Sequence, residues 1–87
     1  MSLTGQTAFV ARSGVRAKVL GDLSKGPKTP SELARIESEH LSHVSRALAE
    51  LRAQGLVESF SQSSKQKFYK TTQRGLELSG ALLRMTK

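Results

Sequence analysis

The chain has 87 residues, a formal net charge of +7 and no cysteine. A chain this short can bury one modest core, so we expect a single domain over residues 1–87, and the lack of cysteine excludes disulfides, thiolate metal sites and thiol redox sensing. Because there is no apolar run long enough to span a membrane and no signal-peptide pattern at the start, we expect a cytoplasmic protein.

The first predicted helix covers about residues 14–23. Ser13 can cap its first turn, and Gly26-Pro27 ends it. We expect the residues before Ser13 to form a separate turn of helix. The apolar side chains of this part are Phe9, Val10, Val15, Val19, Leu20 and Leu23.

A second helix is predicted over about residues 30–37, because every signal that starts a helix is present. The Thr29 hydroxyl can cap it, Pro30 has the fixed φ angle that suits the first helical position, and Glu32 can complete a capping box. The apolar residues expected to face the core are Leu33, Ala34 and Ile36.

A third helix is predicted over about residues 41–54, with Gly55 just past its end as a left-handed cap. Its apolar face consists of Val44, Ala47, Leu48 and Leu51, with Leu41 beside them. The opposite side carries short and polar side chains, among them Ser42, His43, Ser45 and Arg46. Such residues let a helix approach base edges and phosphates closely, although an ordinary solvated face would have the same pattern.

Residues of about 55–72 form two alternating runs around a polar turn, which predicts a β-hairpin. Its tip carries Lys65 and Lys67 without apolar residues, which suits a loop lying against phosphates. Lys28 and Ser31, near the start of the second helix, are expected to contact the phosphate backbone as well. A soluble hairpin loop would also be rich in serine and lysine.

Thr72 can cap a last helix over about residues 73–85. The apolar residues of this helix exceed what one small core needs: Leu76, Leu78, Leu82, Leu83 and Met85. We therefore expect a homodimer formed through the N- and C-terminal helices. The alternative is that these leucines all pack back against the first helix.

The positive charge lies toward both ends of the chain. Residues 1–30 carry five basic and one acidic side chains, residues 31–59 carry three and five, and residues 60–87 carry six and one. Attraction to phosphate is therefore expected from the hairpin, from the last helix and from the basic residues Arg12, Arg16, Lys18, Lys25 and Lys28. Selectivity among DNA sequences is expected from the third helix, through Arg46 and small polar groups.

Several runs form one joint pattern. They are Arg16 with Val19 and Leu20, Thr29 to Ala34, Leu41 to Leu48, Gly55 to Val57, and Tyr69 to Thr72 followed by Arg74-Gly75. From Phe9 to about Met85 the chain resembles the winged helix-turn-helix transcription regulators of the MarR and ArsR-like superfamily, in particular the compact archaeal type. The resemblance implies a mainly α fold with a small β-hairpin: a three-helix core, a two- or three-stranded wing and a C-terminal helix.

The resemblance also implies a sequence-specific double-stranded DNA-binding transcription regulator. The helix at 41–54 would enter the major groove as the recognition helix, with Ser42, His43, Ser45 and Arg46 facing bases and phosphates and with Lys65 and Lys67 as wing contacts. Two features differ from the family pattern. Ser38 and Glu39 replace the usual Gly and aliphatic residue of the turn, and His40 replaces a Ser or Thr cap, so the pattern fixes the first residue of the recognition helix only to within one or two positions.

No phosphate loop, nucleophile elbow or paired catalytic carboxylates are present, so neither an enzyme nor a cofactor is expected. His40 and His43 have no third metal ligand beyond Glu37 or Glu39, so we expect no metal site. One rival function is a winged-helix protein–protein adaptor in a transcription or replication complex, which would carry exposed aliphatic residues on the recognition helix, where we expect none. Another is a nonspecific chromatin-like DNA binder, which differs in salt dependence and sequence preference.

Overall fold

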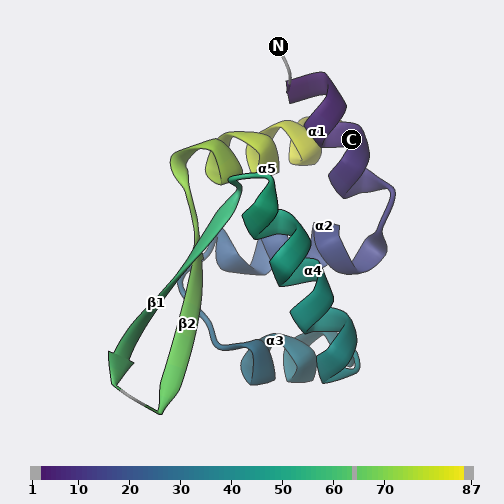
Figure 1. Ribbon diagram of the computed structural model, residues 1–87. Helices are drawn as coiled ribbons and strands as arrows, with labels where there is room; N and C mark the ends of the chain where they lie inside the picture. Colours follow the sequence, from purple (N-terminus) through teal and green to yellow (C-terminus); the bar gives the residue numbers. More distant parts are fainter. Residues whose placement is uncertain (1–2, 64, 86–87) are drawn as a thin grey trace.

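A computed structural model describes residues 3–63 and 65–85 of the chain (Figure 1). Its elements, in chain order, are α1 (Leu3–Ala11), α2 (Gly14–Leu23), α3 (Pro30–Glu37), α4 (Leu41–Ala53), β1 (Val57–Ser63), β2 (Gln66–Thr71) and α5 (Gln73–Met85). The fold is mainly helical with a two-stranded antiparallel hairpin, which confirms the predicted fold class. The hairpin extends away from the helices beside α3, and α5 lies at the other end of the molecule (Figure 1).

The capping signals read from the sequence are present as hydrogen bonds. The backbone N–H of Glu32 donates to Thr29 Oγ1 at 3.1 Å, and the N–H of Thr29 donates to Glu32 Oε1 at 2.8 Å, which completes the capping box of α3. Ser13 Oγ accepts from the N–H of Arg16 at 3.2 Å and starts α2 in the same way. The starts of these two helices are therefore determined by local chemistry.

The turn between α3 and α4 closes without the usual glycine. Ser38 takes the left-handed conformation itself, with φ at 54°, and its N–H donates to the carbonyl of Arg35 at 3.3 Å. His40 has extended backbone and no side-chain cap, yet α4 begins at Leu41. The turn is therefore tight, although it lacks both the glycine and the side-chain cap.

α1 is a helix of nine residues, longer than the single turn expected from the sequence. Among its described side chains only Thr7 and Val10 are buried, so a periodic apolar face contributes little to this helix. Tertiary contacts hold it instead: Val10 is fully buried in the core, Gln6 Nε2 donates to the carbonyl of Gln54 at 3.0 Å, and Arg74 Nε donates to Gln6 Oε1 at 2.6 Å. Tertiary contacts with the ends of α4 and α5 therefore stabilise α1 where local sequence does not.

The core lies around α2, which contacts α1, α3, α4, α5 and β2. Its fully buried residues come from almost every element: Val10, Val19, Leu20, Leu23, Leu33, Val44, Leu48, Leu51, Leu56, Val57 and Leu78. The hairpin is joined to this core by two backbone hydrogen bonds between Lys28 and Tyr69, of 3.1 and 2.9 Å. This short bridge fixes where the hairpin leaves the helices.

The expectation that Ile36 faces the core is wrong, because its side chain is 51% exposed. On α3 the buried side lies between Leu33, which is fully buried, and the half-buried Ala34. At about 100° per residue, Ile36 lies about 60° beyond Leu33 in the opposite direction. Leu33 is the one buried residue of this helix, so the face that it turns to the core is narrow, and Ile36 lies outside that face.

Two carboxyls meet where α2 and α3 approach each other. The pKa of Glu37 is raised above its ordinary value of 4.5, first by a hydrogen bond with Asp22, then by burial and by the negative charge of Asp22; Lys18 acts in the opposite direction. Asp22 Oδ2 is buried and no other described group donates a hydrogen bond to it, so a proton on Glu37 would be its donor. Glu37 is the last residue of α3, so this pair lies directly before the turn that leads into α4.

We expect Glu37→Gln to stabilise the fold at neutral pH by less than about 1 kcal/mol, since an amide can donate to Asp22 at any pH and the site is partly exposed. Because the folded-state pKa of Glu37 is raised, the stability that its proton contributes is fully present below pH 4.5 and is lost as pH rises through the folded pKa. Urea unfolding at pH values below and above 4.5 measures this pH dependence of stability, with Glu77→Gln as control. A pH dependence unchanged by Glu37→Gln would contradict the shared proton.

Candidate nucleic-acid interface

One side of α4 is exposed over most of its length. Val44, Ala47, Leu48 and Leu51 are buried beneath it. The residues predicted to contact DNA from this helix, Ser42, His43, Ser45 and Arg46, are all exposed, as is the small Ala49. The face is thus open to a partner and bears short side chains, apart from Arg46 and the residues at its edges.

A hollow of about 440 Å³ lies between the start of α3, the first turns of α4 and the tip of the hairpin. Four predicted site residues from three distant segments line it, namely Ser31, Ser45, Lys65 and Lys67. The remaining lining residues are Thr29, Pro30, Leu41 and Gln66. The fold therefore places two ammonium groups and two hydroxyls beside the first turns of α4, an arrangement suited to a phosphate backbone.

Lys28 does not line this hollow. Its Nζ donates to the backbone carbonyls of Asp22 and Gly26, at 3.1 and 3.3 Å, and so covers the C-terminal end of α2. Its backbone is the one that bridges to Tyr69. In this structure Lys28 holds the loop between α2 and α3 together, and its predicted phosphate contact would require the ammonium to leave these carbonyls.

His43 lies on the flank of α4 away from the hollow. Its Nδ1 is 3.4 Å from Glu39 Oε1, and its ring meets that of His40 edge-on, with centroids 5.2 Å apart. Within the described residues no group of three His, Cys, Asp or Glu side chains could hold a metal ion. His43 therefore faces solvent beside a carboxylate, at the edge of the exposed face.

Arg16 is mostly buried beside the core and does not face phosphates, contrary to the expectation from the charge distribution. Its Nη1 is 3.1 Å from Glu50 Oε1 on α4, and its guanidinium lies 3.9 Å from the centre of the Phe9 ring. The side chain is only 15% exposed. Arg16 links α1, α2 and α4, so the positive charge that this end of the chain can offer DNA is smaller than the sequence indicates.

Leu41 is a further candidate site residue that the sequence did not indicate. The sequence places it beside the apolar face of α4, but its side chain is 50% exposed and lines the hollow with Ser45, one turn further on. The expectation that this helix carries no exposed aliphatic residue is therefore wrong. Leu48 and Val44 already fill the core beneath this part of α4, and as the first helical residue Leu41 projects past them.

The hairpin is stiffened by its own side chains. Phe60 and Phe68 are directly opposite in the register and stack with ring centroids 5.7 Å apart. Lys70 Nζ lies 5.6 Å from the centre of the Phe60 ring and 3.8 Å from Glu58 Oε2. Cross-strand pairs of this kind stabilise an isolated hairpin, so the exposed Lys65 and Lys67 are held at the end of an ordered ribbon.

This arrangement of helices, turn and hairpin is a winged helix-turn-helix. A family model described as a helix-turn-helix domain matches residues 13–59, more than half of the chain, and the chain belongs to this family. That segment covers α2, α3, α4 and the first part of β1. None of the curated proteins matches the chain by sequence.

Solved structures of bacterial regulators share the fold. ZitR of Lactococcus lactis in complex with DNA is 17% identical over 80% of this chain and 49% of its own, with a TM-score of 0.72. AdcR, the adhesin competence repressor of Streptococcus pyogenes, is 14% identical over 85% of this chain and 56% of its own, with a TM-score of 0.80. MepR, a transcription regulator of the Staphylococcus aureus multidrug efflux pump MepA, is 20% identical over 84% of this chain and 56% of its own, with a TM-score of 0.77.

The predicted resemblance to winged helix-turn-helix regulators is confirmed at the level of fold and domain family. The matching family model is that of a helix-turn-helix domain, and the fold is shared with solved structures of transcription regulators. The chain spans about half the length of the regulators that it matches. Among residues 3–63 and 65–85, no helix is long and apolar enough to cross a bilayer.

Proposed function

We propose that this chain is a sequence-selective double-stranded DNA-binding module of a transcription regulator. In this proposal α4 lies in the major groove and the wing lies against the phosphate backbone. The observation that carries it is the single hollow in which Ser31, Ser45, Lys65 and Lys67 meet beside the exposed face of α4. This function implies a cytoplasmic location, where the chain has access to DNA.

The two kinds of contact have different roles. Lys65, Lys67 and Ser31 would bind phosphates, which gives affinity without sequence information. Ser42, Ser45 and Arg46 would reach base edges, with His43 at the margin of the same face. Arg46 is the one long cationic side chain in the first two turns of α4, and Arg pairs with guanine through two hydrogen bonds.

We expect Arg46→Ala to weaken binding to a preferred duplex by about tenfold to a hundredfold, since one bidentate base contact contributes about 1–3 kcal/mol of discrimination. Binding to random duplex should change little. The measurement is fluorescence anisotropy with duplexes enriched from a random pool and with a scrambled control. Arg52→Ala, on the last turn of the same helix, is the matched control. Equal losses on both duplexes would contradict a base-reading role for Arg46.

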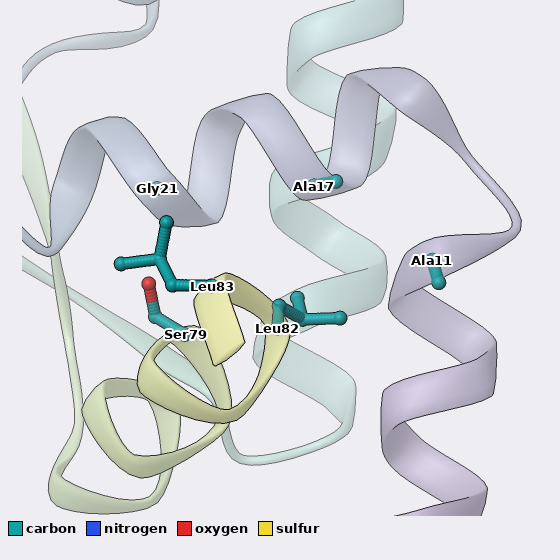
Figure 2. Close-up of a pocket in the computed structure, with 6 residues that line it drawn as sticks. All are labelled: Ala11, Ala17, Gly21, Ser79, Leu82 and Leu83. Atoms are coloured by element: carbon teal, nitrogen blue, oxygen red, sulfur yellow. The ribbon is translucent and has the colours of Figure 1, made fainter. Parts of the chain in front are cut away.

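We also propose that the chain forms a homodimer through its terminal helices. An apolar groove of about 300 Å³ lies between α1, α2 and α5, lined by Ala11, Ala17, Gly21, Ser79, Leu82 and Leu83 (Figure 2). Leu83 is 69% exposed and Leu76 is 44% exposed on α5. A large aliphatic side chain beside a groove floored by small residues suits a two-fold interface, in which each copy fills the groove of the other.

On this proposal the wild-type chain sediments at twice its mass of 9.5 kDa at tens of micromolar. Leu83→Glu should give a monomer, because a carboxylate buried in an apolar interface without a partner costs several kcal/mol. Ile36→Glu, at another exposed aliphatic position, on α3, is the control and should remain dimeric. A wild-type chain that sediments as a monomer would contradict the dimer and leave the DNA-binding proposal in place.

The protein–protein adaptor is the second candidate, and the exposed aliphatic side chains of Leu41 and Ile36 favour it. An adaptor would bind no duplex DNA with useful affinity, and its contacts would not weaken steeply with salt. A nonspecific DNA coater would show that salt dependence without any enriched motif. Selection from random duplex DNA, repeated at raised salt, separates all three functions.

A further inference from the structure

The exposed Leu41 stands among polar and cationic groups that suit DNA. It is the first residue of α4 and shares the hollow with Ser31, Ser45, Lys65 and Lys67. Half of its surface is open to water, while Val44 and Leu48 beneath it are fully buried. Its outer half therefore contacts no other part of the core and is available to a partner.

The chemistry of the neighbouring groups indicates what Leu41 would meet. The two lysines that line the hollow and the hydroxyls of Ser31 and Ser45 suit the phosphates of one strand. With the DNA backbone held in this hollow, the first turn of α4 is the part of the helix that comes closest to the base edges of the major groove. Leucine has no donor or acceptor, and the one apolar group on those edges is the 5-methyl group of thymine.

We propose that Leu41 is a specificity-determining residue that reads thymine through contact with its 5-methyl group. This inference rests on the proposed function and adds to it a base identity at the start of the recognition helix. The mechanism is the removal of two apolar surfaces from water, which needs close approach but no directional bond. Ser45, one turn along the same flank, leaves room for that approach because its side chain is short.

The test replaces thymine by uracil, which deletes the methyl group and keeps every hydrogen-bonding edge. A motif is first enriched from random duplex DNA with the wild-type chain, and each conserved thymine is then replaced singly by deoxyuridine. We expect one replacement per half-site to weaken binding by about fourfold, as for burial of one methyl-sized group. With Leu41→Ala the thymine and uracil duplexes should bind alike, and with Leu41→Met part of the discrimination should return.

Ile36→Ala is the matched control, because Ile36 is equally exposed but does not line the hollow. It should keep the full preference for thymine. If a motif is enriched and no uracil replacement changes the affinity, or if Leu41→Ala keeps the preference, the inference is overturned while the proposed function stands. If no motif is enriched, sequence-selective binding itself is contradicted, and the thymine contact with it.

Discussion

Replacing both wing lysines, Lys65→Ala with Lys67→Ala, is expected to lower affinity for every duplex, preferred or random. Each phosphate contact releases counterions, so removing two should reduce the slope of log K against log salt by about 1.8. Affinity should fall on the order of tenfold to a hundredfold at about 0.1 M salt. The sequence preference should remain, because phosphates carry no direct sequence information. Titrations at several salt concentrations measure both quantities.

The control for the wing variant changes the net charge equally at another place. Lys18 and Lys25, which the charge distribution alone places among the sources of attraction to phosphate, are exposed but do not line the hollow. Lys18→Ala with Lys25→Ala should therefore leave the salt slope nearly unchanged. If this control lowers the slope as much as the wing variant does, then overall charge rather than the wing holds the DNA.

A large loss of stability is expected from a substitution at Gly75, in the first turn of α5. A Cβ added there would collide with the backbone carbonyl of Leu56 and press on Thr71. The carbonyl cannot move easily, because it accepts the N–H of Thr72 at 3.0 Å, while the Thr72 hydroxyl donates to the carbonyl of Gly55 at 2.7 Å. We expect Gly75→Ala to lower the free energy of unfolding by about 3 kcal/mol, or to prevent folding.

Gly80→Ala in the same helix provides the matched control. Around its added Cβ the nearest described atom is Arg84 Nη1 at 3.9 Å, an ordinary contact. Alanine in a helix interior is favoured over glycine by about 1 kcal/mol, so this variant should be slightly more stable than the wild type. Thermal unfolding followed by circular dichroism compares the two. Similar stabilities for both variants would contradict the close approach at Gly75.

The sequence predicted those parts of the fold that local chemistry determines. The capping box of Thr29 and Glu32, the Ser13 cap and the period of Val44, Ala47, Leu48 and Leu51 each act within one or two turns of chain. Local signals could not predict α1, because contacts of Gln6 with Gln54 and Arg74 hold it. Nor could they predict that Arg16 turns inward to Glu50 and Phe9.

The sequence predicted the individual residues of the candidate site but not that they lie together. Ser31, Ser45, Lys65 and Lys67 were each identified from their own segment, yet only the fold shows that they share a hollow. Leu41 was overlooked because an apolar residue at helical spacing is usually a core residue. Its position as the first residue of α4 is what exposes it, and that depends on where the turn at Ser38 ends.

If the exposed face of α4 enters DNA, a DNA-cleaving group placed on that face will cut the bound duplex. The chain has no cysteine, so a single Ala49→Cys can carry an iron chelate at one known position. Glu77→Cys on α5, at the end of the molecule away from the wing tip, is the control (Figure 1). We predict strand cleavage within the enriched motif from position 49 and none from position 77. Cleavage from position 77 with intact DNA at position 49 would contradict the account.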